Sequence, residues 1–330
     1  MNKILAGDIG GTKTNLALFD VVENSLVLQG QHQYISREFS SFTDILTDFK
    51  ERISMTRIDA ACFGIAGPII DGGCRTTNLP WEIGTSTLQE YLDCDKVRLL
   101  NDLEATAYGM LTLGEDEFID LNSRGQAVKG NRAVIAAGTG LGEAMLFWDG
   151  NNYHAIGTEG GHSDFAPSTP QQDRLLSWLR YRYGEHVSFE RIVSGPGMTT
   201  LYEFLSESKY APEPDFIIQA KEGSDRSALI SEGALMQKDP LCMETLRLFV
   251  EIYGAEAGNL ALKTMSLGGV YIGGGIAPKI LSAMSSNAAF MNAFVRKGRF
   301  EPMLRGMSVK VSLNAETALL GAAHFAQDRL

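Results

Sequence analysis

Near its start the chain reads Leu5-Ala6-Gly7-Asp8-Ile9-Gly10-Gly11-Thr12-Lys13-Thr14-Asn15, and the alternating stretch Leu16-Ala17-Leu18-Phe19 follows. A short apolar strand therefore runs through an acidic residue into a turn of glycine and threonine, and a second strand leaves that turn. Glycines let the backbone amides of a tight turn approach an anion closely, and threonine hydroxyls add donors. A divalent cation would balance the Asp8 carboxylate beside such an anion. The stretch predicts a phosphate-binding β-hairpin.

A second stretch of the same kind begins at Ala133 and reads Ala-Val-Ile-Ala-Ala-Gly138-Thr139-Gly140-Leu141-Gly142. When the first stretch is shifted by 129 positions, Gly11 falls on Gly140 and the apolar strand after the first turn falls on 145–149. An internal duplication would produce this match, whereas two unrelated hairpins are the alternative, because Gly-Thr turns are common. The matched context favours phosphate binding by both turns, so that a side chain at Gly140 is expected to block phosphate. The residues concerned are Gly10, Gly11 and Thr12 in the first turn, and Gly138, Thr139, Gly140 and Gly142 in the second.

Other phosphate motifs fit less well. Lys13 is preceded by threonine and no helix pattern follows, so the chain has no Walker loop there. The glycines at 138–142 lack the last glycine of the dinucleotide fingerprint and lead into a strand. Gly273-Gly274-Gly275 follows a predicted strand and precedes a helix starting near Pro278. That segment either holds a nucleotide at a helix N-terminus or is only a tight strand–helix turn, which the local pattern favours.

Composition narrows the class of protein. At 330 residues, with 44% hydrophobic residues, two domains with full cores are expected. The net charge of −11 disfavours nucleic acid and anionic membrane surfaces as partners, because both select basic patches. The four cysteines have no metal-ligand or disulfide spacing, no N-terminal signal is visible, and the longest apolar run, around 60–70, is broken by glycines and Pro68. We therefore expect a cytoplasmic protein without a membrane span.

The order of predicted elements indicates an α/β fold in two parts. The first part has strands near 3–9, 14–20 and 26–35, a helix at about 41–54 capped by Ser40 or Ser41, a strand at 60–66, a helix at 84–92, a strand at 96–101 and a helix at 103–113. The series restarts with strands at 132–137, 143–148 and 152–156, helices near 171–183, 198–207, 225–237 and 240–265, a strand at 269–273, two further helices, a strand at 308–313 and a helix at about 315–327. This repeated order predicts two α/β domains with a cleft between them. We place a small domain at 1–113 plus about 310–330, and a large domain at about 114–309.

Six segments occur in order and together resemble one family. They are Asp8-Ile-Gly10-Gly11-Thr12, Asn101-Asp102-Leu-Glu-Ala-Thr-Ala-Tyr-Gly109, Ala137-Gly-Thr-Gly-Leu-Gly142, Glu159-Gly-Gly-His162-Ser-Asp-Phe-Ala-Pro167, Glu190-Arg-Ile-Val-Ser-Gly-Pro-Gly197 and Gly269-Val-Tyr-Ile-Gly-Gly-Gly-Ile-Ala-Pro278. The chain resembles the bacterial glucokinase family of the hexokinase/actin/Hsp70 ATPase superfamily nearly end to end, including Lys297-Gly-Arg-Phe300. The hairpins are typical of the whole superfamily, whereas the segments at 159–167 and 190–197 are specific to the family. The resemblance implies two hexokinase/actin-like domains, each a mixed β-sheet flanked by helices.

Asp102 is the candidate catalytic residue. It follows the predicted strand at 96–101 and begins a helix, so it lies at the carboxyl end of a strand, where α/β sites form. A carboxylate within hydrogen-bond reach of a sugar hydroxyl can take its proton as the phosphoryl group arrives. On the local pattern Asp102 also reads as a helix N-cap, a role compatible with catalysis. The resemblance implies that Asp102 is the general base toward the 6-hydroxyl of glucose.

The resemblance also implies a set of sugar ligands, because hexose recognition needs carboxylates, amides and an imidazole facing a ring of hydroxyls. The matching residues are Asn78, Asn101, Asp102, Glu159, His162 and Glu190. From spacing alone, Glu159-x-x-His162 reads as a metal pair or, more readily, as loop residues with satisfied hydrogen bonds. The related repressor/open-reading-frame/kinase branch carries a zinc-binding cysteine cluster after its Gly-His. This chain has no cysteine between 94 and 242, so we expect no zinc.

The cofactors that the resemblance implies are ATP and Mg²⁺. ATP–Mg²⁺ would lie between the two hairpins, with Thr12, Thr139 and neighbouring amides on the β- and γ-phosphates. Adenosine would lie over Gly274 and Gly275, and Asp8 would orient Mg²⁺ through water. The implied reaction is phosphorylation of D-glucose at O6 to glucose 6-phosphate, the first step of glycolysis, with domain closure excluding water.

Two other functions stay open on the sequence. A kinase for another hexose or an amino sugar differs by as little as one hydroxyl contact. A non-catalytic sugar sensor or repressor of this superfamily carries a helix-turn-helix segment ahead of the first hairpin. Because the first strand begins near Lys3 and Asp102 is present, we favour an enzyme. Glucose and ATP are the expected partners and a homodimer is compatible with the resemblance, whereas neither nucleic acid nor a membrane is expected.

Overall fold

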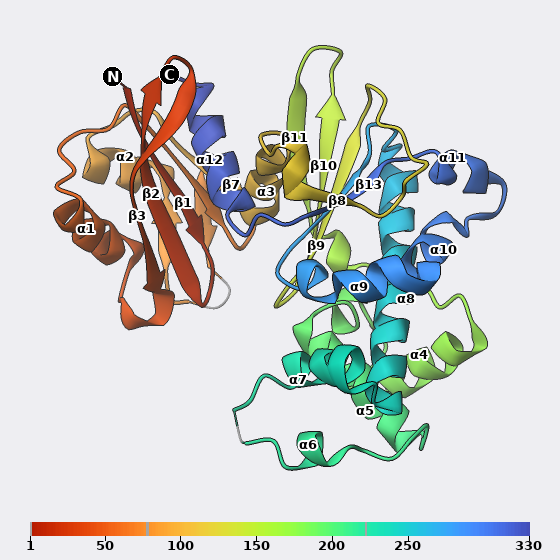
Figure 1. Cartoon of the computed structure of the whole chain (residues 1–330). Helices are drawn as coiled ribbons and strands as arrows, with labels where there is room; N and C mark the ends of the chain where they lie inside the picture. The colour runs from red at the N-terminus through yellow and green to blue at the C-terminus, as the bar shows by residue number, and fades with distance from the viewer. Residues whose placement is uncertain (1, 77–78, 222) are drawn as a thin grey trace. The chain divides into compact units, whose positions relative to one another are not determined.

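The computed structural model describes residues 2–76, 79–221 and 223–330, and the chain divides into two compact units (Figure 1). The first unit comprises Met1–Glu117, His154–Gly157 and Asn314–Leu330, and the second comprises Phe118–Tyr153 and Thr158–Leu313. The sequence predicts divisions at 113/114 and at about 309/310. It does not predict that residues 154–157 group with the first unit.

A five-stranded mixed sheet forms the first unit, in the order β3-β2-β1-β4-β7. The first three strands are antiparallel, whereas β1, β4 and β7 run parallel. The elements of this unit are β1 (Asn2–Ile9), β2 (Lys13–Val22), β3 (Ser25–Ile35), α1 (Phe42–Arg52), β4 (Ala60–Ile65), β5 (Gly73–Arg75), β6 (Glu82–Gly84), α2 (Thr85–Leu92), β7 (Val97–Asn101), α3 (Asp102–Met110) and α12 (Thr317–Gln327).

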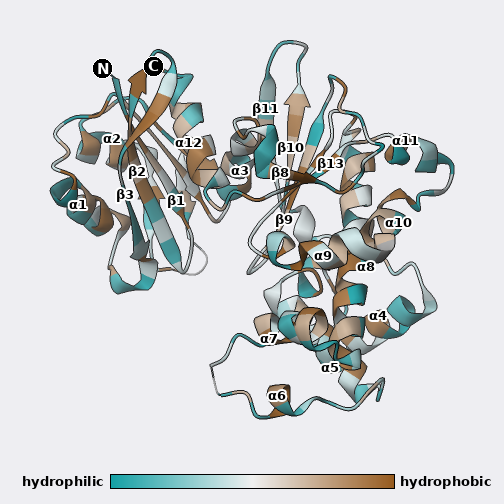
Figure 2. Ribbon diagram, viewed as in Figure 1, coloured by the Kyte–Doolittle hydropathy of each residue, from teal (hydrophilic) through white to brown (hydrophobic). Residues whose placement is uncertain are grey.

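Alternation along the strands gives this sheet two apolar faces. Leu5 and Ile9 of β1 belong to a core built with α1 and α2, whereas Ile4 and Ala6 belong to a core built with α3 and α12. Figure 2 shows hydrophobic segments, in brown, on the strands of this unit and on α12, whereas much of the α1 ribbon is teal, the colour of hydrophilic residues. Ser41, one of the two predicted caps, begins α1 with a capping box to Asp44.

Helices α3 and α12 meet at glycines that leave no room for a side chain. A Cβ at Gly109 would lie 1.9 Å from the carbonyl oxygen of Thr317, and a Cβ at Gly321 would lie 1.8 Å from that of Ala105. Backbone oxygens at these distances cannot move without separating the helices, so glycine at both positions is what allows α3 and α12 to pack this closely.

Gly109→Ala is therefore expected to destabilise the protein, although alanine is the better helix former. Overpacking of this kind lowers the free energy of unfolding by about 1–3 kcal/mol or more. Urea denaturation measures the loss. Gly73→Ala, where the nearest atoms lie 3.7 Å away, is the control and should change stability by no more than about 0.5 kcal/mol. Equal effects of the two substitutions would contradict the tight helix contact.

A six-stranded sheet in the order β11-β10-β9-β12-β13-β8 forms the second unit, and its first five strands repeat the strand order of the first sheet. The matched hairpins predict this repetition. The elements are β8 (Phe118–Asp120), β9 (Arg132–Ala137), β10 (Leu141–Trp148), β11 (Tyr153–Thr158), α4 (Pro170–Tyr183), α5 (Gly195–Glu207), α6 (Asp215–Ile218), α7 (Arg226–Glu232), α8 (Pro240–Thr264), β12 (Val270–Gly273), α9 (Leu281–Ser285), α10 (Ala289–Val295), α11 (Glu301–Arg305) and β13 (Val309–Ser312).

Helix α8 is the longest helix of the second unit and packs on α5, α10 and β9. Asp239 caps it by accepting the N–H of Cys242 at 2.9 Å. Its buried Tyr253 accepts a hydrogen bond from the N–H of Ala137 at 3.2 Å, at the end of β9. Helix α8 thereby supports the strand that leads into the second glycine turn. Within the described ranges, no helix combines the length and the apolar character needed to cross a membrane.

Candidate active site

Three parallel strands of the first unit end at one edge of the sheet. Ile9 of β1 pairs in register with Ile65 of β4, and Ile65 pairs with Asn101 of β7. Asp8 pairs with Gly64, and a Cβ at Gly64 would lie 3.8 Å from the Cα of Asp102. The structure thus brings Asp8, Asn101 and Asp102 to the carboxyl edge of this sheet, where sites of α/β proteins form.

Asn101, and not Asp102, is the N-cap of α3. The Oδ1 of Asn101 accepts the N–H of Leu103 at 2.9 Å, and Glu104 completes a capping box by accepting the N–H of Asn101 at 3.0 Å. The prediction that Asp102 is the N-cap is therefore wrong. The sequence could not decide between the two residues, because asparagine and aspartate are both good caps. Asp102 is the first residue of the helix, and its Oδ1 also accepts the N–H of Leu103, at 2.9 Å. Its carboxylate lies at the positive end of the helix dipole.

The surroundings of Asp8 disfavour the ionised form of its carboxyl group. Burial raises the pKa of its carboxyl group to about 6, and a hydrogen bond from Asn15 offsets part of that rise. A nearby cation would favour the charged form. The turn beyond Asp8 closes through the N–H of Gly10, which donates to the carbonyl of Lys13 at 2.9 Å, and Thr12 is exposed.

The carboxylate of Asp8 is a suitable ligand group for a magnesium ion. In the described part of the chain, no three His, Cys, Asp or Glu side chains stand close enough together to hold a metal ion by themselves. Mg²⁺ commonly keeps several waters and is held through one or two carboxylates plus substrate phosphates. A single, partly buried carboxylate beside a glycine turn fits that pattern.

The second glycine turn is surrounded by two other segments. The N–H of Gly138 donates to the carbonyl of Gly140 at 2.8 Å, and the N–H of Gly195, at the start of α5, donates to the carbonyl of Gly138 at 2.8 Å. Gly274 has φ +80°, and its Cβ would lie 2.3 Å from the carbonyl oxygen of Ala137, so only glycine fits there. The turn, the positive end of α5 and the Gly274–Gly275 segment therefore meet. The contribution of α5 is not predicted from the sequence.

A cavity of about 260 Å³ opens beside this arrangement. Met198, Leu235 and Ile276 contribute apolar walls, and Ser227 and Lys279 contribute polar groups. A Cβ at Gly195 would lie 3.6 Å from the carbonyl oxygen of Gly138 and 3.7 Å from Ser227 Oγ, so the cavity adjoins the glycine turn. An apolar cavity with a few polar groups is typical of small-molecule sites. Around this cavity, the sequence singles out the second glycine turn and the Gly274–Gly275 segment as candidate ATP-binding residues, but it does not indicate the cavity itself.

Two predicted sugar ligands of the second unit, His162 and Glu190, lie on short 3-10 helices, η3 (Gly160–His162) and η4 (Phe189–Arg191). Their flanks are tied by an isolated bridge between Asp164 and Ser188. His162 Nε2 lies 3.8 Å from Glu190 Oε1. Glu190 Oε2 accepts the N–H of Leu141 at 3.0 Å, so Glu190 connects His162 with the second glycine turn.

Glu159 immediately precedes η3 and is exposed, and its carbonyl accepts the N–H of His162 at 3.0 Å. The structure therefore brings Glu159, His162 and Glu190 together in the second unit, as it brings Asn101 and Asp102 together in the first. Asn78, the remaining predicted sugar ligand, lies outside the described residues.

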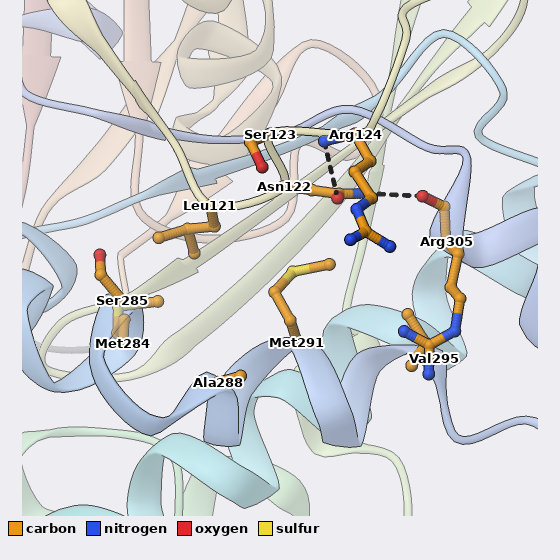
Figure 3. A pocket seen from close by; sticks show the side chains of 10 residues that line it. All are labelled: Leu121, Asn122, Ser123, Arg124, Met284, Ser285, Ala288, Met291, Val295 and Arg305. Carbon is orange, nitrogen blue, oxygen red and sulfur yellow. Dashed lines mark hydrogen bonds between the residues drawn. The ribbon is translucent and has the colours of Figure 1, made fainter.

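A different pocket, of about 210 Å³, is lined by Leu121, Arg124 and Met291 among others (Figure 3). Asn122 fixes one wall by donating from Nδ2 to the carbonyls of Arg305 at 3.0 Å and Met307 at 2.7 Å. These two residues precede β13, so the pocket lies at the opposite edge of the sheet from Gly274. None of the predicted site residues that the structure describes lines it.

Comparisons with known proteins agree with one another. A family model described as Glucokinase matches residues 5–329. The glucokinase of Nostoc punctiforme is 39% identical over 336 residues, which cover 98% of each chain. A crystal structure of glucokinase from an Antarctic psychrotroph is similar with a TM-score of 0.84 at 30% identity, over 99% of each chain. A ROK family glucokinase from Streptomyces griseus in complex with glucose and AMPPNP is similar in fold, with a TM-score of 0.66 at 20% identity over 99% of this chain and 100% of that one.

Proposed function

This chain belongs to the glucokinase family, and we propose that it transfers the γ-phosphoryl group of ATP to O6 of D-glucose, giving glucose 6-phosphate. The main support for the proposal is the position of Asp102, which follows the N-cap of α3 at the carboxyl edge of the first sheet. The match to the family model, from residue 5 to 329, also supports it.

Asp102 is the general base of the proposed reaction. A sugar hydroxyl is a poor nucleophile until its proton is taken, and a positioned carboxylate contributes roughly 10²–10⁴-fold to such a step. The N–H of Leu103 holds Asp102 Oδ1 at 2.9 Å, which fixes the direction of the carboxylate. The proton of the 6-hydroxyl passes to Asp102 as the O6–phosphorus bond forms and the bond between the γ-phosphorus and ADP breaks.

The two glycine turns hold the phosphates. Thr12 and Thr139 are exposed at the tips of the turns and offer hydroxyl donors beside the backbone amides. Asp8 is the residue that would hold Mg²⁺ through water, and the ion when bound neutralises charge on the phosphates. The cavity beside Gly195 and Ile276 receives the adenosine, because its apolar walls suit a base and it adjoins the second turn.

Glucose is bound by Asn101, Glu159, His162 and Glu190 together with Asp102, and Asn78 stays a predicted ligand. Within each unit the proposed ligands are neighbours: Asn101 and Asp102 adjoin at the start of α3, and His162 Nε2 lies 3.8 Å from Glu190 Oε1.

Glu159→Ala is expected to raise the KM for glucose at least tenfold with little change in the KM for ATP. A buried sugar hydroxyl that loses its acceptor costs about 1–3 kcal/mol or more, and a tenfold rise in KM corresponds to about 1.4 kcal/mol of that range. Steady-state kinetics with each substrate varied measure the effect. Glu185→Ala removes an exposed carboxylate of the same unit and serves as the control. A wild-type KM for glucose in a folded Glu159→Ala variant would show that Glu159 does not bind the sugar.

A panel of hexoses, amino sugars and nucleoside triphosphates tests the proposed function. We expect efficient turnover with glucose and ATP. Saturation by another sugar but not by glucose would overturn the substrate assignment and keep the kinase class, because one hydroxyl contact decides between sugars. Sugar binding without any turnover would favour a sensor. The homodimer and the cytoplasmic location stay predictions, the former tested by light scattering on the purified chain.

A further inference from the structure

A buried carboxyl group lies beneath the turn that carries Glu159 and His162. Glu143 of β10 is 1% exposed, and within the described part of the chain no N–H or O–H group of another residue donates to its Oε1. A Cβ at Gly160 would lie 2.1 Å from Glu143 Oε2, and a Cβ at Gly161 would lie 2.0 Å from the carbonyl oxygen of Leu141. The two glycines therefore rest directly on β10, with the Glu143 carboxyl group under the first of them.

The backbone of the same turn is also tied to Glu143. Thr158 Oγ1 donates to the carbonyl of Glu143 at 3.0 Å, and the N–H of Gly160 donates to Thr158 Oγ1 at 3.1 Å. Both the side chain and the main-chain carbonyl of Glu143 thus contact the residues at the start of η3 and fix their position. Because Glu159 precedes η3 and His162 ends it, their positions depend on how this turn sits.

On its other side, Glu143 faces a network of hydrogen-bonded polar side chains that is formed by α8 residues and Lys297. Glu256 is fully buried beside it. Asn259 Nδ2 donates to Glu256 Oε2 at 2.8 Å, and Lys263 Nζ lies 3.4 Å from Glu256 Oε1. Lys297 Nζ donates to Asn259 Oδ1 at 2.6 Å and to the carbonyl of Ala255 at 2.9 Å. Glu256 therefore has donors that hold it in place, and it offers a rigid acceptor to Glu143.

The protonation states of the pair follow from this environment. Burial, and then the neighbouring Glu256 carboxylate, raise the pKa of Glu143 to about 8. Burial also raises the pKa of Glu256, but Asn259 and Lys263 oppose that rise. At neutral pH Glu143 is then a neutral acid with a proton to donate, and Glu256 is the acceptor.

We propose that Glu143 is a positioning residue for sugar binding: braced by Glu256, its buried carboxyl group holds the Gly160–Gly161 turn so that Glu159 and His162 face a hexose. This role rests on the proposed function. A merely structural role makes a different prediction, because replacing a buried ionisable pair by apolar residues often leaves stability unchanged or raises it. Only a positioning role moves the glucose KM while the ATP KM stays in place.

The proposal also predicts a pH dependence. The titratable groups that face Glu143 are Glu256, Lys263 and Tyr253 of α8, and Lys297 reaches the pair through Asn259. Because the folded chain holds the Glu143 proton more tightly than an unfolded one does, the arrangement is intact below about pH 8 and is lost as the pH rises through that value. Two adjacent buried carboxylates then repel each other, and the glucose KM of the wild-type protein should rise.

The test compares Glu143→Leu and Glu143→Gln with the wild-type protein at pH 7 and pH 9, by steady-state kinetics and by calorimetric titration of glucose. Glu143→Leu should raise the glucose KM and Kd at least tenfold, with the ATP KM within twofold of wild type. Glu143→Gln keeps a neutral donor, so it should match wild type at pH 7 and lack the rise in glucose KM at pH 9. Leu246→Ala, a buried α8 substitution, should lower Tm without changing either KM.

An unchanged glucose KM in Glu143→Leu, or an equal rise of both KM values, would overturn the positioning role. If Glu143→Leu does not fold, Glu143→Gln decides: a rise in glucose KM at pH 9 equal to that of wild type would overturn it. Absence of glucose turnover in the wild-type protein is a failure of the proposed function instead. The same comparison then uses the hexose that saturates the protein, and if no hexose does, both proposals fall.

Discussion

Asp102→Asn is expected to fold, to bind glucose and to lose most of its turnover. An amide has nearly the shape of a carboxylate, and its oxygen can still accept the N–H of Leu103 that fixes Asp102. The cap of α3 is untouched, because Asn101 supplies it. What the amide cannot do is take the proton of the 6-hydroxyl, so kcat should fall by about 10²–10⁴-fold.

Three measurements on the same preparation separate this loss from misfolding. Thermal denaturation should show a Tm close to that of wild type, calorimetry should show glucose binding, and steady-state kinetics should show the fall in kcat. Asp164→Asn changes an exposed carboxylate that is bonded to His186 and should leave kcat unchanged. A near-normal kcat in folded Asp102→Asn would reject Asp102 as the base.

Gly140→Val is expected to weaken the binding of both substrates. From the sequence, a side chain at Gly140 is expected to block phosphate alone, and so to raise the KM for ATP far more than that for glucose. The structure changes this expectation, because a Cβ at Gly140 would lie 2.4 Å from Glu190 Oε2. Glu190 must move, and it then loses the N–H of Leu141 and its place 3.8 Å from His162. The KM for glucose should therefore rise at least tenfold together with the KM for ATP.

Thr139→Ala is the matched control, since it removes an exposed hydroxyl from the same turn and should raise the KM for ATP only. Kinetics with each substrate varied at saturating levels of the other distinguish the two variants. If Gly140→Val raised only the KM for ATP, the link between Glu190 and the second glycine turn would have no part in sugar binding.

The sequence predicts the two glycine turns and the strands beside them, because these features are local, whereas phosphate binding by the turns stays a prediction. A turn that brings amides to an anion needs glycine, and the strands on either side alternate in hydropathy. Local sequence is also the reason why the N-cap of α3 is predicted wrongly. Asn101 and Asp102 are both good caps, and only the paths of their side chains show which one closes the helix.

Features that depend on distant parts of the chain are not predicted. The cavity beside Gly195 joins Met198, Ser227 and Ile276 from three separate segments. Ile276 lies within the segment 269–278 that resembles the family, but nothing in the sequence indicates that the other two residues lie beside it. Strand β8 (Phe118–Asp120) is three residues long, follows an acidic run, and exists because it pairs with β13. The burial of Glu143 could have been predicted from the sequence. It lies two residues after Leu141 in β10, so its side chain points to the same, buried face.

Phosphorus and carbon NMR of glucose incubated with ATP, Mg²⁺ and the purified chain shows both whether phosphate is transferred to the sugar and to which oxygen. We expect one glucose 6-phosphate for each ADP formed, with the phosphorus coupled to C6. Phosphate on another hydroxyl, ATP hydrolysis without a sugar phosphate, or no consumption of ATP would contradict this expectation.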